Sequence, residues 1–474
     1  MPGLPYYPAR RAAAQASGRP KFGPGGIYAP ETPWPFQHTG AQRLALWYVA
    51  WTSHATTRRE ESIAMDFEVT YTPEQEAFRA EVRAWLADNI PEGMQQPVDP
   101  GDLSLEQYQK SRELGRRLGA KGWLYPTYPK QYGGGELSVD FVIILEEELD
   151  RYGLHLPPYY DSGGRLGGAS IFVWGTEEQK QHFLTPIFRG EWRTWQLLSE
   201  PNAGSDLASV QTRAVRDGDD YVVNGQKIYI GSLHGCEMMW TIVVTDPDRP
   251  RHENLGWLMI PYGLPGITVV PMELLTAGGE GGASPGLKHT VFFDNVRVPA
   301  FNLVGGENNG WKVATTHLEL EHGGGGIIRR NRVVDQFLEY CTTTKRNGQT
   351  LSQDPDVRDD MVEVFIKNEI FRLFGLRTYW LSHAHKPRSY EGPQLSYWRK
   401  TQALEIAEII LRAVGPYAMT NDAQWGPLNG LLEHYQRSAV VGLHPGGTTD
   451  IQKVIMARRI GIGRAEREQA GRLR

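Results

Sequence analysis

Hydrophobic periodicity changes twice along this chain of 474 residues, and that change constrains the fold more than any other feature. From about residue 72 to 190, apolar side chains recur at helical spacing, as Phe78, Val82 and Leu86 do. From about 191 to 300, short alternating segments follow, separated by Gly, Pro, Asp and Asn. The helical spacing returns after Gly310. We therefore expect an α+β protein in which a small β-barrel or sandwich stands between two helical regions.

Two helix starts carry clear signals. Thr72-Pro73 and Asp354-Pro355 each place a capping side chain before a proline at the first helical position. Further helices are expected over 105–118, 139–152, 404–414 and 451–460, where the apolar period is again helical.

Composition excludes several classes of protein. Hydrophobic residues make up 40% of the chain and charged residues 22%, which describes a globular protein with enough material for a core. A net charge of −5 gives no electrostatic reason to expect nucleic acid. Two cysteines are too few for a disulfide framework, no metal site is predicted, and no apolar run approaches the roughly 18 residues of a membrane span. We expect a soluble, intracellular protein.

The stretch from Trp195 to Gly231 carries most of the chemical information. It opens with a turn-rich loop, Ser199 to Asp206, whose small residues let backbone N–H groups and hydroxyls approach a ligand. Asp217-Gly218 and Asn224-Gly225 then punctuate two alternating segments, a pattern typical of hairpins. A loop of donors carried by a small sheet predicts a cradle for a polar cofactor.

The order of these motifs resembles the middle domain of the acyl-CoA dehydrogenase family, in which the same loop holds the isoalloxazine ring of FAD. Other segments resemble the family in the right order, namely Tyr128–Gly134 with Glu146–Leu149, Gly175–Lys180, Phe292–Pro299, and Ile451–Arg464. The resemblance implies an N-terminal helical domain, a middle β-barrel domain and a C-terminal four-helix bundle. Corresponding boundaries are 65–190, 191–302 and 303–474.

Residues 1–64 precede the family pattern, which begins only after Met65. The first 30 residues hold four basic and no acidic side chains, as an organellar transit peptide does, but their Pro and Gly content opposes an amphipathic helix. We expect a disordered extension or a mis-assigned start. The resemblance favours a cytoplasmic protein of bacterial type over a mitochondrial matrix protein.

The resemblance implies an oxidoreductase that converts an acyl-CoA thioester to the trans-2-enoyl-CoA, with a glutamate as base and flavin N5 as hydride acceptor. Many family members carry that glutamate in a C-terminal loop, at the position of Gly446 here, and glycine cannot take a proton. A second family solution places the base on the first helix of the C-terminal bundle. Register there indicates Glu321, with Glu319 as the alternative and the loss of any base as a third possibility. Ser205, Glu319 and His322 are predicted to contact substrate.

Cofactor contacts carry over from the family position by position. The predicted FAD-binding residues are Gln196, Leu198, Ser199, Ser205, Tyr229, Gly231, Ser232, Arg346, Thr448 and Asp450. Arg346 is the candidate for an arginine that reaches the pyrophosphate from a partner subunit. Arg412–Tyr417 stands where an adenine-contacting motif is common, and only Gly415 of that motif is kept.

Two other functions compete. One alternative is a non-catalytic or half-site subunit of a heteromeric acyl-CoA dehydrogenase. Three features fit it: a glycine at position 446, an insecure candidate for the pyrophosphate arginine, and an adenine motif that keeps only Gly415. Gly282–Gly286 has the G-x-S-x-G spacing of a serine hydrolase, but Pro285 lacks the N–H that an oxyanion hole needs there.

Partners and substrate follow from the same resemblance. It implies an acyl-CoA substrate, an electron-transferring flavoprotein as electron acceptor, and a homotetramer or a heterotetramer with a related chain. Four glycines, residues 323–326, follow the predicted base, where larger side chains are usual, and so predict a wide pocket for branched, aromatic or polycyclic acyl groups, as in steroid side-chain β-oxidation.

Overall fold

The computed structural model describes residues 71–94, 103–272, 274–276, 288–323, 331–384, 386–422 and 424–462. All of them belong to one structural unit, Thr39–Arg474. The predicted extension at 1–64, the serine-hydrolase motif at 282–286 and most of the glycine run at 323–326 lie outside the described residues.

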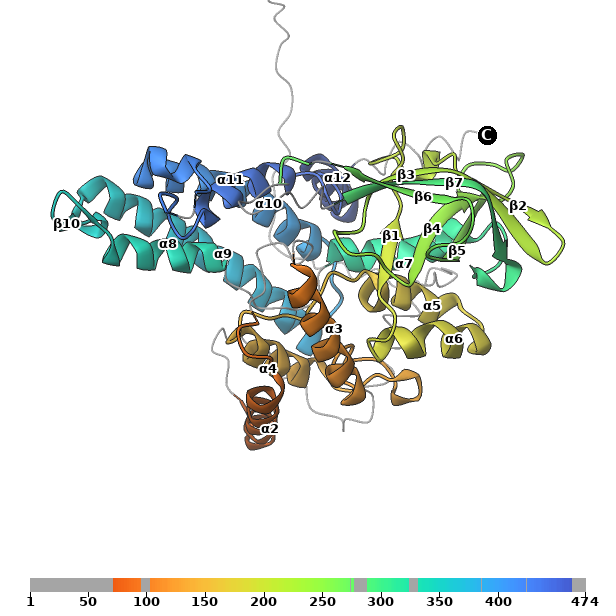
Figure 1. Ribbon diagram of the computed structural model, residues 1–474, viewed down its shortest axis with the longest axis horizontal. Coiled ribbons are helices and arrows are strands. Elements are labelled where there is room, and N and C mark those ends of the chain that lie inside the picture. The colour runs from red at the N-terminus through yellow and green to blue at the C-terminus, as the bar shows by residue number, and fades with distance from the viewer. Residues whose placement is uncertain are drawn as a thin grey trace, which may run out of the picture. The chain divides into compact units, whose positions relative to one another are not determined.

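Of the residues described before the sheet, most lie in five α-helices, which Figure 1 labels. They are α2 (Pro73–Asn89), α3 (Leu105–Ala120), α4 (Val139–Asp150), α5 (Gly168–Trp174) and α6 (Glu177–Phe188). The predicted start of α2 is confirmed, because Thr72 and Gln75 exchange side-chain and backbone hydrogen bonds in a capping box, and Pro73 is the first helical residue. A π-helical turn, η3 (Gly163–Gly167), leads into α5.

Eight strands form the middle of the chain. They are β1 (Thr194–Leu197), β2 (Arg213–Asp217), β3 (Asp220–Ile230), β4 (Met238–Val244), β5 (Leu255–Pro261), β6 (Ile267–Met272), β7 (Lys288–Pro299) and β8 (Leu303–Val304). Their order is β6-β7-β3-β2-β4-β5-β8, and β1 pairs in parallel with β4. The two halves of this path meet through Arg213 and Val244, and they enclose one apolar core, which holds Val223, Leu258 and Val291.

One of the two predicted hairpin turns is wrong. Asp217-Gly218 does turn the chain, since Asp217 pairs with Asp220 and Gly218 has φ +62°. Asn224-Gly225 instead lies inside β3, where the pairing with β7 shifts register between Val223 and Gly225. A β-carbon at Gly225 would lie 2.6 Å from Oγ1 of Thr212, so the glycine permits a bulge where β3 passes close to the segment that holds Thr212.

Helices return after the sheet. They are α7 (Gly310–Gly323), α8 (Arg332–Thr343), α9 (Pro355–His383), α10 (Glu391–Val414), α11 (Leu431–Val441) and α12 (Thr449–Arg459), with a small hairpin of β9 (Lys345–Arg346) and β10 (Gln349–Thr350). The predicted start of α9 is confirmed, because Asp354 caps it and Pro355 is its first residue. The helices α8, α9, α10 and α11 run together and share a second core (Figure 1).

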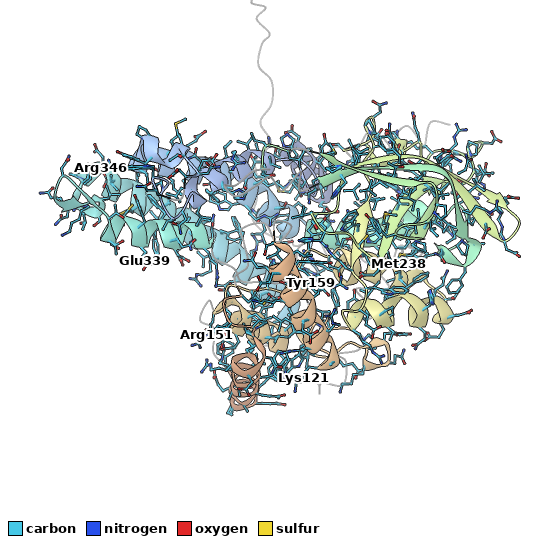
Figure 2. The ribbon with its side chains drawn as sticks, viewed as in Figure 1. Lys121, Arg151, Tyr159, Met238, Glu339 and Arg346 are labelled. Carbon is cyan, nitrogen blue, oxygen red and sulfur yellow. The ribbon has the colours of Figure 1, made fainter. Side chains whose placement is uncertain are left out.

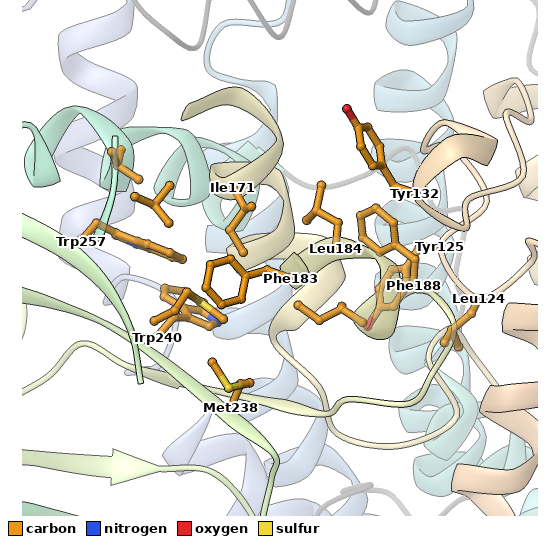
Figure 3. Packing of buried hydrophobic residues seen from close by; sticks show 14 of the residues in the cluster. Leu124, Tyr125, Tyr132, Ile171, Phe183, Leu184, Phe188, Met238, Trp240 and Trp257 are labelled. Atoms are coloured by element: carbon orange, nitrogen blue, oxygen red, sulfur yellow. The ribbon is translucent and has the colours of Figure 1, made fainter. Parts of the chain in front are cut away.

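The helical and sheet parts share a core around one phenylalanine and two tryptophan side chains. Phe183 of α6 faces Trp240 of β4 and Trp257 of β5 (Figure 3), and the two indole rings stack at a centroid distance of 5.4 Å. The imidazole of His317, on α7, meets Trp240 edge-on at 4.8 Å. The sheet therefore fixes the position of α7, which carries the predicted base one turn later.

No helix within the described ranges is both long enough and apolar enough to span a bilayer.

Candidate active site

Glu321 lies on the last turn of α7, at a point where several elements meet. Burial raises the pKa of its carboxyl group. The side chain of Gln196, on β1, donates a hydrogen bond to the carboxylate, and the positive charges of Arg165 on η3 and Lys400 on α10 oppose the rise. The site therefore combines partial desolvation with three groups that stabilise the ionised form.

Gly446 faces this carboxylate from the loop between α11 and α12. A β-carbon at Gly446 would lie 3.4 Å from Oε1 of Glu321 and 3.8 Å from its Cγ. The residue has φ +64°, a conformation that favours glycine. The carboxylate of Glu321 therefore stands against the position from which the resemblance expects a loop glutamate to project.

The two neighbouring substrate candidates behave differently. Glu319 is exposed, and two residues along a helix correspond to a rotation of about 200°, so its carboxylate lies on another side of α7. The side chain of His322 is outside the described part of the chain. Of the predicted acidic residues, Glu321 is the one that the fold brings to Gly446.

A buried ion pair closes the loop that follows β1. The Nζ atom of Lys227 lies 2.8 Å from Oε1 of Glu200, and both side chains are almost fully buried. The carboxylate also accepts hydrogen bonds from the backbone N–H groups of Gln211 at 2.6 Å and Thr212 at 3.0 Å. Desolvation lowers the pKa of Lys227 to about 8, while Lys227 and the backbone donors hold the pKa of Glu200 below its ordinary value.

Lys227 also ties the start of the loop to the sheet. Its ammonium donates hydrogen bonds to the carbonyl oxygen atoms of Leu198 at 3.3 Å and Ile242 at 2.9 Å. The carbonyl of Ser199 accepts a hydrogen bond from the N–H of Ile228 at 2.9 Å. The predicted contacts Leu198 and Ser199 are therefore held rigidly, and the side chain of Leu198 is buried in the core.

The remaining predicted contacts from the middle domain split into exposed and buried positions. Ser205 is exposed on the turn, and the ring of Tyr229 is also exposed, on a backbone with φ +62°. Gly231 has φ +69°, and a β-carbon there would lie 2.3 Å from the indole of Trp195. Ser232 is buried, and its hydroxyl accepts a hydrogen bond from Arg193. The exposed side chains of Ser205 and Tyr229 are accessible to a planar ligand, whereas the hydroxyl of Ser232 is buried beside Arg193.

The C-terminal candidates lie on two separate elements. Thr448 caps α12 by accepting a hydrogen bond from the N–H of Ile451, and Asp450 on its first turn is exposed beside Lys453 at 3.2 Å. Arg346 donates a hydrogen bond to the carbonyl of Val414 at 2.7 Å. Figure 2 shows Arg346 at the end of the helices that is remote from Met238 on β4. Within one chain, Arg346 does not join the other predicted contacts.

The donor set fits a flavin ring. Backbone groups of a clamped loop, the exposed Ser205 hydroxyl and the exposed Tyr229 ring lie on the middle domain, and no atom lies within 4 Å of where a β-carbon of Gly204 would stand. Gly446 and Gly447 both adopt positive φ and leave their loop without side chains. Glycines at these positions leave the backbone N–H groups of both loops open to a ligand.

Three family models match the chain in order. They are the acyl-CoA dehydrogenase N-terminal domain at residues 72–191, the middle domain at 196–296 and the C-terminal domain at 308–461. The chain belongs to the acyl-CoA dehydrogenase family. The family predicted from the sequence is thereby confirmed, together with the α+β fold of helical, sheet and helical domains. Acyl-CoA dehydrogenases are oxidoreductases and flavoproteins, so FAD is the cofactor of this chain.

Several relatives resemble the chain over most of its length. Acyl-CoA dehydrogenase FadE26 of Mycobacterium tuberculosis is 29% identical over 411 residues, which cover 84% of this chain and 100% of the relative. Among solved structures, the ChsE4–ChsE5 complex from Mycobacterium tuberculosis gives a TM-score of 0.69 at 27% identity and covers 83% of this chain and 98% of its own. The Tcur3481–Tcur3483 steroid ACAD gives 0.69 at 26% identity, with 83% and 98% covered.

Sequence reasoning missed the residues that hold the site together. Lys227 lies in the stretch from Trp195 to Gly231 and Gln452 in the segment Ile451–Arg464, but neither residue was predicted to have a role. Glu200 likewise lay in the flavin loop. No local pattern marked Arg165 or Lys400, because their approach to Glu321 depends on packing between distant elements.

The ion pair between Glu200 and Lys227 gives a testable prediction. Lys227→Met leaves a buried carboxylate without its counter-charge, so we expect the free energy of unfolding, measured by urea denaturation, to fall by about 3–5 kcal/mol. The double variant Glu200→Gln/Lys227→Met should recover part of that loss. Arg297→Met, which removes an exposed pair with Asp217, is the control and should cost less than about 1 kcal/mol. If Lys227→Met and Arg297→Met lowered the free energy of unfolding equally, the ion pair between Glu200 and Lys227 would not stabilise the loop as described.

Proposed function

We propose that this acyl-CoA dehydrogenase uses Glu321 as the base that removes the α-proton of the acyl-CoA thioester. The observation that carries the proposal is the contact between the Glu321 carboxylate and the β-carbon position of Gly446. A glutamate on α7 thus reaches the space next to the loop position that the family commonly uses. The missing loop glutamate is replaced from the helix.

The surroundings of Glu321 suit a base at neutral pH. Burial raises the pKa of the carboxyl group, which makes the carboxylate more basic than an exposed glutamate. Gln196, Arg165 and Lys400 stabilise the ionised form and so keep a carboxylate available to take the proton. Bound FAD supplies the acceptor for the β-hydride.

Residues of the middle domain and of α12 are proposed to hold the cofactor. The clamped backbone of Leu198 and Ser199, the exposed Ser205 and Tyr229, and the loop that ends at Thr448 form the set for this chain. Ser232 is assigned to the frame, because Arg193 occupies its hydroxyl. Arg346 is proposed to act on the cofactor of a partner subunit.

Replacement of Glu321 by glutamine tests the base. Glu321→Gln keeps the size of the side chain but cannot accept the proton, so anaerobic bleaching of the flavin by acyl-CoA should slow by about 10²–10⁴-fold, with FAD still bound. In the unsubstituted enzyme, kcat/KM should fall as pH drops through the raised pKa of Glu321, because protonation removes the base. Glu319→Gln, two residues away on an exposed side of α7, is the matched control and should behave as the unsubstituted enzyme.

A relocated carboxylate sharpens the same test. Glu321→Ala/Gly446→Glu moves the carboxylate to the loop and removes the atom that crowds it. Part of the activity lost in Glu321→Ala should return, limited by the roughly 1–2 kcal/mol that a side chain costs at positive φ. Full bleaching by Glu321→Gln would refute the assignment, whatever the relocated variant does.

The substrate is proposed to be a branched or polycyclic acyl-CoA. Support comes from similarity to the steroid ACAD of Tcur3481–Tcur3483 and from the glycine run after Glu321. We expect kcat/KM to be at least about tenfold higher for isobutyryl- or steroid-side-chain thioesters than for butyryl- and octanoyl-CoA, since removed side chains relax the shape of a pocket. A preference for the straight chains in the same panel would count against a wide pocket.

A second candidate is a subunit of a heteromeric complex. The matched ChsE4–ChsE5 structure is named as a complex of two chains, which favours this alternative. We expect the chain expressed alone to be yellow, tetrameric and able to reduce a dye, because Glu321 is in place. Colourless or insoluble protein that a related chain rescues on co-expression would favour the heteromer. An electron-transferring flavoprotein as acceptor and a cytoplasmic location stay predictions from the resemblance.

A further inference from the structure

Lys400 is a buried lysine that the reaction described above does not explain. It lies on α10 with only 4% of its surface exposed. Its ammonium donates hydrogen bonds to the carbonyl oxygen atoms of Pro445 and Gly447, the latter at 2.9 Å. These two residues flank Gly446, so the ammonium bridges the loop directly behind the residue that faces Glu321.

Gln452 completes this attachment from another helix. Its side chain, fully buried on the first turn of α12, donates a hydrogen bond from Nε2 to the carbonyl of Gly446 at 2.9 Å. Three successive carbonyl groups, of residues 445 to 447, are therefore held by two side chains from two helices. The loop has little freedom to move away from α7, although Gly446 and Gly447 have no side chains to anchor it.

Among the described residues, two charged groups act on the carboxylate of Glu321. Arg165 approaches from η3 and Lys400 from α10, while Gln196 on β1 and Gly446 on the loop are neutral. Lys400 in turn is faced by Arg399 and Glu321. Lys400 is thus the group that both contacts the loop and acts electrostatically on the carboxylate.

We propose that Lys400 is a positioning residue for the reaction: its ammonium fixes the loop against which the Glu321 carboxylate rests and supplies the positive charge that keeps this carboxylate ready to accept a proton. This inference rests on the proposed role of Glu321. A neutral donor would satisfy the loop carbonyls equally well. Burying an ammonium costs free energy, and desolvation lowers the pKa of Lys400 to about 8. The interaction of the ammonium with the carboxylate of Glu321 therefore accounts for a charged side chain at this buried position.

Lys400→Met removes the charge and the donors together. The acid limb of the pH profile of kcat/KM reports ionisation of the base, and it should move to higher pH by about one unit, because a carboxylate without its neighbouring cation binds a proton more tightly. Lys400→Arg keeps the charge and should leave the limb near its original pH. Lys312→Met, which removes an exposed lysine of the same helix as Glu321, is the control and should change nothing.

Gln452→Leu separates the two roles of Lys400. It releases the carbonyl of Gly446 without changing the charge, so kcat should fall at every pH while the acid limb stays in place. Hydrogen exchange of the amides from 443 to 450 should quicken in Lys400→Met and in Gln452→Leu, and it should stay slow in Lys400→Arg and Lys312→Met. This readout does not depend on activity.

The outcomes distinguish this inference from the role of Glu321. If Glu321→Gln is inactive but Lys400→Met keeps the original acid limb, the electrostatic role of Lys400 is refuted while the base stands. If Glu321→Gln is fully active, the base itself is refuted. Should Lys400→Met be recovered only as unfolded protein, Lys400→Gln, which keeps a donor and lacks the charge, should still move the acid limb to higher pH while hydrogen exchange of the loop stays slow; an unmoved limb in this variant would refute the electrostatic role.

Discussion

The buried ion pair between Glu200 and Lys227 is the interaction on which the cofactor side of the molecule depends. It joins the start of a long loop, through Glu200, to the loop's far end, through the N–H groups of Gln211 and Thr212. Lys227 carries the same connection into β4 through the carbonyl of Ile242. A loop with small, polar residues at its turn would otherwise gain little from packing. The ion pair makes it a rigid part of the sheet.

A second constraint acts beside Glu321, the proposed base. The indole of Trp240 packs against His317 of α7 and against Trp257, so the sheet positions α7. The loop between α11 and α12 is held in turn by Lys400 and Gln452. Glu321 and Gly446 therefore meet because two separately anchored elements converge. The contact does not arise from local sequence.

The fold followed from the sequence more fully than the site did. Apolar spacing and the pairs Thr72-Pro73 and Asp354-Pro355 predicted the succession of helices, strands and helices, because these signals act locally. The Asn224-Gly225 turn failed because pairing with β7 on one side and Thr212 on the other outweighs the turn preference.

Register indicated Glu321 as the candidate base, and the fold brings its carboxylate to Gly446, while its catalytic role stays a prediction. The surroundings of Ser232 could not be read from its motif, because its hydroxyl accepts a hydrogen bond from Arg193, which lies on another part of the chain; its contact with FAD stays a prediction. Lys400 is about 80 residues from Glu321 in sequence and has no motif of its own. Such a residue becomes visible only when the helices are packed together.

The conformation of Gly446 limits which side chains the loop can carry. Gly446 and Gly447 have φ +64° and +75°, values that side chains other than glycine adopt only with strain. A glutamate at Gly446 would therefore meet both backbone strain and the side chain of Glu321, whose Oε1 lies 3.4 Å from the β-carbon position. The site has room for one carboxylate, from the helix or from the loop, and the backbone of the loop disfavours the second arrangement.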